Sequence, residues 1–268
     1  MPHHDNIPIW EVEISVIGPI TVTENININA RKELEHPEPF YSRIKIKNTE
    51  NGFKATVTAF APNPELAEKA AILFFGRMLD VLSIKLNLSL QLDVTKNILI
   101  QKINQTTKRI VDENDFKDAF EDSRLFSLKE TTISRALSWF RKGKHTQDAY
   151  DKYLAFWNSI ETITSKYNPN KEACKGKGSV CHMWECFKKL WGECGEWKVI
   201  TGQTKWIDEG NKIRKDIAHG VIPIEIEHIE KVVARLPEME SVAYHFIYDW
   251  IHNELDVEIT DELLQRMK

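Results

Sequence analysis

Two side chains near the end of one predicted helix are suited to metal-independent chemistry on RNA. Arg214 and His219 lie five residues apart in the segment 211–220, which reads NKIRKDIAHG. An imidazole can take the proton of a 2′-hydroxyl, and a guanidinium can stabilise the charge that develops on a phosphate. Five residues turn an ideal helix by about 140°, so the two side chains diverge if the helix continues straight through His219. Gly220 and Pro223 are normal helix stops, which allows His219 to turn back toward Arg214.

A simpler interpretation of the same two residues involves no catalysis. Arg214 then forms a surface ion pair, and His219 is a histidine that interacts favourably with the dipole at the helix C-terminus. A nearby carboxylate bears on this choice, because Glu161 follows Trp157 by four residues and therefore lies on an apolar helical stripe. A buried carboxylate needs a partner, and Arg214 is the cation that we expect within ion-pairing distance. Alternatively, Glu161 stands at the edge of the stripe and reaches water.

These residues resemble the HEPN superfamily (higher eukaryotes and prokaryotes nucleotide-binding), whose members are helical bundles. The sequence from Arg214 to His219 is similar to the family signature R-x(4–6)-H, and the segment 153–161, YLAFWNSIE, is similar to the upstream HEPN helix that carries an inward polar residue. An α+β region before such a bundle is similar to the MauJ-like and ApeA-like HEPN proteins of bacteria. The resemblance covers roughly residues 123–254.

The resemblance implies a ribonuclease that acts as a homodimer and needs no cofactor or metal, for example a toxin or a phage-defence effector. Arg214 and His219 of each subunit would meet across the interface as catalytic residues, with Glu161 supporting them. Some HEPN proteins are not catalytic, so a dimerisation or ligand- or RNA-binding module is the alternative. Lys215 departs from the commonest pattern, which has a small polar residue after the arginine. A cation at this place disfavours the protonated imidazole.

Apolar periodicity predicts the helices that must position these residues. Every segment after the middle of the chain shows the spacing of one buried helical face, and together they predict an all-α bundle. The last helix contains Pro237, which removes an amide donor and is expected to kink or split it. The predicted helical segments are 128–143, 150–168, 182–191, 205–219 and 226–253.

The first part of the chain has the pattern of an α+β domain. Alternating apolar residues predict strands at 9–16 and 88–92 and a hairpin at 44–59 that turns at Asn51 and Gly52. Asn63 and Pro64 are typical of a helix start, and they predict a long helix that covers the sheet. A polar stretch then marks the boundary. We therefore divide the chain into an α+β domain, residues 1–110, and a HEPN-like helical bundle, residues 111–268.

The four cysteines form a cluster that is the second candidate site. Cys174, Cys181, Cys186 and Cys194 lie close together in the sequence, in a chain whose N-terminus does not have the pattern of a secretion signal. Such a cluster is more typical of free thiols or metal ligands than of disulfides. The cluster contains no C-x-x-C pair, so we predict plain thiols without a stoichiometric metal. A structural zinc site that includes His182 is the alternative.

The charge balance restricts how RNA could bind. The chain has 36 Lys and Arg residues against 40 Asp and Glu residues, so no global basic field is present and an RNA site must be a local patch. Basic residues gather at the turn between the first two bundle helices, at Arg141, Lys142, Lys144, His145 and Lys152. This cluster either holds phosphate or is a solvated turn.

The most apolar run is too short for a membrane span. Arg77 and Asp80 interrupt it before it reaches the length that crosses a bilayer. We therefore expect no membrane insertion and a cytoplasmic location.

Overall fold

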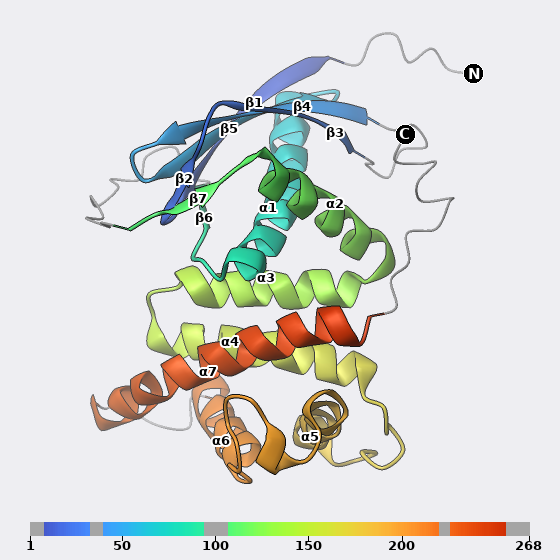
Figure 1. Ribbon diagram of the computed structural model, residues 1–268, viewed down its shortest axis with the longest axis vertical. Helices are drawn as coiled ribbons and strands as arrows, with labels where there is room; N and C mark the ends of the chain where they lie inside the picture. Colours follow the sequence, from blue (N-terminus) through green and yellow to red (C-terminus); the bar gives the residue numbers. More distant parts are fainter. Residues whose placement is uncertain (1–7, 33–39, 94–106, 220–225, 256–268) are drawn as a thin grey trace. The chain divides into compact units, whose positions relative to one another are not determined.

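The computed structural model describes residues 8–32, 40–93, 107–219 and 226–255, which form two compact units. An antiparallel sheet with helices makes up the first unit, and helices alone make up the second (Figure 1). The first unit extends to Leu125 and the second begins at Phe126. The division therefore falls later than the predicted boundary at residues 110 and 111. Among the described helices, none combines the length and apolar character that a membrane span requires.

The sheet of the first unit has five strands in the order β3-β4-β5-β1-β6, and all neighbours are antiparallel. Val12 faces Val57 across the central pair, and Ile14 faces Ala55. Because side chains alternate between the faces of a strand, this register gathers the apolar residues on one face. The strands are β1 (Ile9–Ile17), β3 (Ile26–Lys32), β4 (Phe40–Thr49), β5 (Gly52–Phe60) and β6 (Gln91–Asp93).

The predicted strand at 9–16 and the hairpin are confirmed, and the strand predicted at 88–92 is present as the shorter β6, whereas β3 has no counterpart among the predictions. Its buried residues Ile26 and Ile28 alternate with exposed asparagines, which is the pattern of a half-buried strand. The turn between β4 and β5 depends on Gly52, because a Cβ atom there would come 2.1 Å from the carbonyl oxygen of Val16. Gly52 also has φ +146°, a backbone conformation that side-chain-bearing residues rarely adopt.

Helix α1 (Pro64–Leu86) covers the apolar face of the sheet, as predicted. The Asn63 side chain caps it, with Oδ1 2.8 Å from the backbone nitrogen of Leu66. Phe75 on the helix meets Phe53 on β5 edge to face, with ring centroids 6.1 Å apart. The core of the first unit lies between this helix and the sheet.

Helix α2 (Glu113–Lys129) explains why the unit boundary lies later than predicted. Its Phe116 packs on Phe53 and its Phe120 on Phe75, with ring centroids 5.3 Å and 5.9 Å apart. The segment before it, β7 (Arg109–Val111), pairs in parallel with β2 (Ile20–Val22) as a second small sheet. The polar stretches at 105–108 and 111–115 suggested a linker, but two phenylalanines one helical turn apart bind the following helix to the first core.

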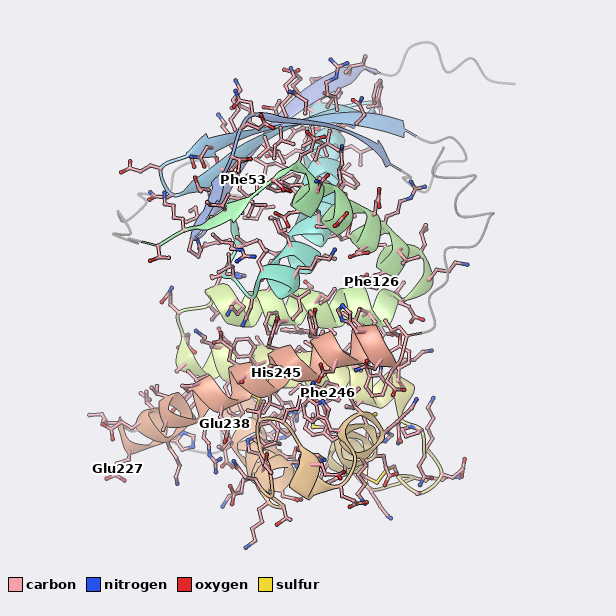
Figure 2. The ribbon with its side chains drawn as sticks, viewed as in Figure 1. Phe53, Phe126, Glu227, Glu238, His245 and Phe246 are labelled. Atoms are coloured by element: carbon pink, nitrogen blue, oxygen red, sulfur yellow. A yellow bond between two sulfur atoms is a disulfide. The ribbon has the colours of Figure 1, made fainter. Side chains whose placement is uncertain are left out.

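The second unit is a helical bundle built around α4 (Ala149–Tyr167). Every other long helix of this unit contacts α4. Aromatic rings fill the space between the helices. Phe246 belongs to α7 (Figure 2), and its ring stacks on Phe187 of α5 with centroids 4.7 Å apart. The other elements are α3 (Thr131–His145), α5 (Gly178–Trp191), a 3₁₀-helix η1 (Cys194–Glu196), α6 (Trp206–Ala218) and α7 (Ile226–Asn253).

Pro237 lies inside α7, which runs without a break from Ile226 to Asn253. Pro237 therefore does not split the helix, and the alternative expectation of a kink stays a prediction. Proline removes one amide donor and leaves the carbonyl of Val233 without its helical partner. Both Pro237 and Val233 are exposed, so water can bind the freed carbonyl oxygen at low cost.

Candidate functional site

Glu161 on α4 and Arg214 on α6 lie side by side in the bundle. Oε2 of Glu161 is 3.6 Å from Nη2 of Arg214, and the two side chains are 22% and 30% exposed. The predicted ion pair is confirmed. The distance exceeds the roughly 2.7–2.9 Å of a strong charge-assisted hydrogen bond, so the contact is loose. Both groups are half-buried and remain within reach of solvent.

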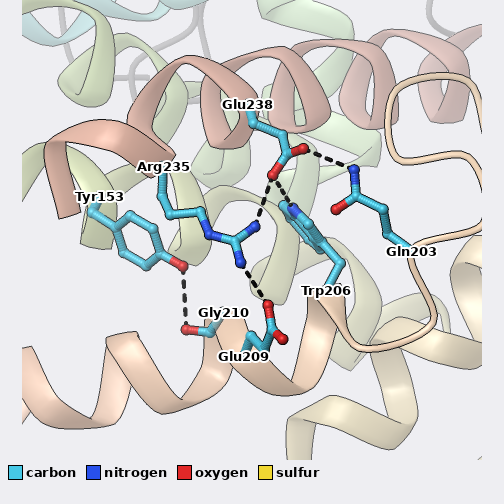
Figure 3. Close-up of polar contacts among 7 residues, drawn as sticks. All are labelled: Tyr153, Gln203, Trp206, Glu209, Gly210, Arg235 and Glu238. Carbon is cyan, nitrogen blue, oxygen red and sulfur yellow. Dashed lines mark hydrogen bonds and ion pairs between the residues drawn. The ribbon is translucent and has the colours of Figure 1, made fainter. Parts of the chain in front are cut away.

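A glycine brings α6 close enough to α4 for this contact. A Cβ atom on Gly210 would come 2.7 Å from Cζ3 of the buried Trp157 ring. The hydroxyl of Tyr153 donates a hydrogen bond of 3.2 Å to the Gly210 carbonyl oxygen (Figure 3). Arg214 follows Gly210 by one helical turn, and Glu161 follows Trp157 by one turn, so the pair forms beside this close approach. The sequence offered one indication, a glycine in the interior of a predicted helix.

A polar network fixes the start of α6 to α7 (Figure 3). Glu238 accepts hydrogen bonds from Gln203 Nε2 at 3.0 Å, Trp206 Nε1 at 2.8 Å and Arg235 Nη1 at 3.1 Å. The second terminal nitrogen of Arg235 lies 2.5 Å from a carboxylate oxygen of Glu209 on α6. Arg235 and Glu238 have the spacing of a helical ion pair, but no pattern in the sequence connects them to the start of α6.

Electrostatics keep the members of this network in the protonation states that it needs. Burial alone would raise the pKa of Glu238, but hydrogen bonds from Gln203, Trp206 and Arg235, together with the charge of Arg235, lower it overall. Burial raises the pKa of the Tyr153 hydroxyl, which therefore stays protonated and donates to Gly210. The network consequently presents a charged acceptor near neutral pH.

His219 stands at the end of α6, as predicted. It is the C-cap residue, and its backbone nitrogen donates to the carbonyl oxygen of Lys215 at 3.0 Å. Its side chain is exposed and forms no hydrogen bond or ion pair with another described residue. The structure thus brings Glu161 and Arg214 together and places His219 on the same helix as Arg214, with no hydrogen bond between them. The predicted helix stop at Gly220 and Pro223 lies outside the described residues.

The cysteine cluster contains a disulfide, so the prediction of four plain thiols is wrong. Cys174 and Cys181 are bonded, with Cα atoms 5.5 Å apart. Successive turns before α5 bring Cys174 back onto the first turn of that helix, which the linear spacing of the cysteines does not reveal. Cys186 is a buried packing residue, and burial raises the pKa of its thiol to about 12. Within the described part of the chain, no cluster of three or more potential ligand side chains could hold a metal ion.

The basic cluster between α3 and α4 is partly neutralised. Lys144 lies 2.5 Å from a carboxylate oxygen of Glu240 and is only 11% exposed. Burial, followed by the charges of Arg141 and Lys142, lowers the pKa of His145 despite a hydrogen bond to the Arg141 carbonyl that raises it. His145 is therefore mostly neutral at pH 7.

Arg214 has the donors to bind an anion at this place. A guanidinium carries five N–H donors, and the Glu161 contact is the only ion pair that Arg214 forms within the described residues. The remaining donors can bind the oxygens of a phosphate in a planar fork.

Comparisons of the chain with protein-family models, curated proteins and solved structures found no match. The function of the protein must therefore be inferred from these residues and their geometry.

Proposed function

We propose that the protein is a metal-independent ribonuclease of the HEPN type. Arg214 binds the scissile phosphate, Glu161 orients the Arg214 guanidinium, and His219 takes the proton of the attacking 2′-hydroxyl. The observation that carries the proposal is the Glu161–Arg214 pair, a contact of 3.6 Å between α4 and α6. It supports the proposal because a carboxylate holds the guanidinium from one side and leaves most of its donors available.

The reaction class follows from the nucleophile. The 2′-oxygen attacks the adjacent phosphorus, the bond from phosphorus to the 5′-oxygen breaks, and the 5′-oxygen takes a proton from water to leave as a hydroxyl. A 2′,3′-cyclic phosphate remains on the upstream fragment. The Arg214 guanidinium stabilises the negative charge that develops on the phosphate oxygens. DNA is not a substrate because it has no 2′-hydroxyl.

We extend the proposal to a homodimer formed by the helical unit, which acts in the cytoplasm as a toxin or phage-defence effector. Ile226, Ile229 and Val233 support a dimer because they form an exposed apolar stripe at helical spacing on α7. A second copy of the site would enclose one phosphate between paired Arg214 and His219 residues. Light scattering is expected to give twice the chain mass at micromolar concentration, and a monomer alone would contradict this part of the proposal.

A non-catalytic dimerisation or RNA-binding module is the second candidate function. The exposed position of His219, with no hydrogen bond to Arg214, favours it. Lys215 also lies next to Arg214 in the sequence and is exposed. In this case Arg214 binds phosphate without cleavage.

Incubation of the purified protein with total RNA in EDTA separates the two functions. The ribonuclease is expected to cleave RNA without metal, to leave 2′,3′-cyclic phosphate ends and to spare DNA. The change His219→Ala is expected to slow cleavage about 10²–10⁴-fold, the usual contribution of a general base. Thermal stability should change little, because the dipole at a helix end contributes at most about 2 kcal/mol.

His252→Ala is the matched control, because His252 is also an exposed histidine in the last turn of a helix. This variant should cleave RNA at the wild-type rate. A folded His219→Ala protein that cleaves at the wild-type rate would end the catalytic proposal in favour of the binding module.

A further inference from the structure

Helix α3 is strongly basic in a chain that is acidic overall. The chain carries a formal net charge of −4, whereas the 15 residues of α3 include four Lys or Arg side chains and no Asp or Glu. The four are Arg135, Arg141, Lys142 and Lys144. A concentration of one sign on a single helix is the local field that holds a polyanion when no global field is present.

Two of these charges point away from the bundle. The buried face of α3 is apolar and includes Ile133 and Phe140. Arg135 and Lys142 are exposed on the opposite face, two helical turns apart, and neither forms an ion pair with another described residue. Lys144, by contrast, pairs with Glu240 and is nearly buried. The outward cations of α3 are therefore available to a ligand.

An aromatic ring lies between the two outward cations. Trp139 follows Arg135 by one turn, precedes Lys142 by one turn, and is half-buried. The Lys142 ammonium lies 5.1 Å from the centre of the Trp139 ring. A base that stacks on the open part of this indole would thus have its phosphate within reach of an ammonium. Alternating cations and aromatic rings are typical of single-strand nucleic-acid surfaces.

We propose that the outward face of α3 is a docking surface for single-stranded RNA. Arg135 and Lys142 bind phosphates on either side of a base that stacks on Trp139. The choice of RNA over other nucleic acids rests on the proposed function, whereas the surface itself rests on the charges and the ring. The two cations are about 10 Å apart along the helix axis, with the indole between them. The surface holds the strand, and the Glu161–Arg214 pair acts elsewhere in the same unit.

Fluorescence anisotropy with a short labelled oligoadenylate tests the proposal, using the full chain with His219→Ala so that the probe stays intact. Adding Arg135→Ser and Lys142→Ser should weaken binding and should reduce the slope of log K against log salt by about 1.4, the value for two lost phosphate contacts on a single strand. Trp139→Ala should weaken binding at least about fivefold, and Trp139→Phe should restore most of it.

The matched control is Lys171→Ser with Lys177→Ser, which removes two exposed lysines from the second unit outside α3. It should keep the affinity and the salt slope of its parent. All four charge-removed positions are exposed, so melting temperatures should agree and a loss cannot come from unfolding. An unchanged affinity and slope in the Arg135→Ser/Lys142→Ser protein, or no binding by the parent at low salt, would overturn the surface.

The outcome also separates this surface from the ribonuclease proposal. If α3 variants lose binding while His219→Ala leaves cleavage unchanged, the result supports the docking surface and contradicts the catalytic role of His219. If His219→Ala abolishes cleavage while α3 variants bind and cleave normally, the result supports the ribonuclease proposal and contradicts the docking surface. A single-stranded DNA probe of the same sequence should show the same relative loss, because neither phosphate contacts nor stacking needs the 2′-hydroxyl.

Discussion

The two ends of α6 hold their charged groups in different ways. At the start of α6, Glu238 of the neighbouring helix α7 accepts hydrogen bonds from three side chains at 2.8–3.1 Å. Near its end, Arg214 meets Glu161 at 3.6 Å and has no other ion pair within the described residues. One carboxylate is saturated with donors, and one guanidinium is nearly unoccupied.

This difference indicates different roles for the two polar clusters. Satisfied hydrogen bonds to a charged group stabilise a structure and fix the position of a helix. A guanidinium with unused donors contributes little to stability but can bind an incoming anion. The network around Glu238 therefore positions α6, and the Glu161–Arg214 pair is the part of the helix that is suited to a ligand.

The largest loss of stability is expected when the hydrogen bonds to Glu238 at the start of α6 are removed. Glu238→Ala removes the acceptor of Trp206, Gln203 and Arg235, so we expect the free energy of unfolding to fall by about 2–3 kcal/mol. Chemical denaturation followed by circular dichroism measures the loss. Glu227→Ala, which removes an exposed carboxylate from the same helix, is the control and should change stability by about 0.5 kcal/mol or less. If both variants are equally stable, the network does not hold α6.

A smaller loss of stability is expected when the Glu161–Arg214 pair near the end of α6 is removed. Arg214→Ala should lower the free energy of unfolding by about 1 kcal/mol or less, because a half-exposed ion pair at 3.6 Å gains little in water. A double-mutant cycle with Glu161→Ala measures the coupling directly. If the ribonuclease proposal holds, Arg214→Ala should nevertheless lose cleavage while it remains folded. A coupling energy above about 3 kcal/mol would show that the pair is structural, like the network at the other end.

The Glu161–Arg214 pair could be predicted from the sequence, whereas the network around Glu238 could not. Each of these two residues was placed from the periodicity of its own helix, and the position of Glu161 on an apolar stripe favoured a cation as its partner over contact with water. Helical periodicity is local, so this inference needed no knowledge of packing. The network of Glu238 depends on the loop that carries Gln203 and on the crossing of α6 and α7. Such contacts between distant segments cannot be deduced from spacing within one segment.

The same distinction applies to the fold. The strands at 9–16 and 88–92, the hairpin at 44–59 and the helix at 64–86 follow from alternation and capping residues, which are local. The disulfide between Cys174 and Cys181 and the attachment of α2 to the first core are contacts between separate segments. Phe116 and Phe120 are spaced as one face of a helix, but spacing within one segment does not show which core they join.

The smallest effect is expected in the acid range and again concerns Glu238, the carboxylate of α7 that binds the start of α6. Its pKa is lowered in the folded protein, so the native state binds fewer protons there than the unfolded chain does. This contribution to stability is therefore present above the usual carboxyl value of 4.5 and is lost as the pH falls through the lower native pKa. Glu238→Gln keeps an acceptor oxygen but removes the titration, so it should be less damaging than Glu238→Ala. Urea unfolding at a series of pH values should show a constant stability difference between wild type and Glu238→Gln above pH 4.5, and the two should converge as the pH falls through the lower native pKa of Glu238. Curves that stay parallel across this range would mean that the hydrogen bonds to Glu238 do not depend on its charge.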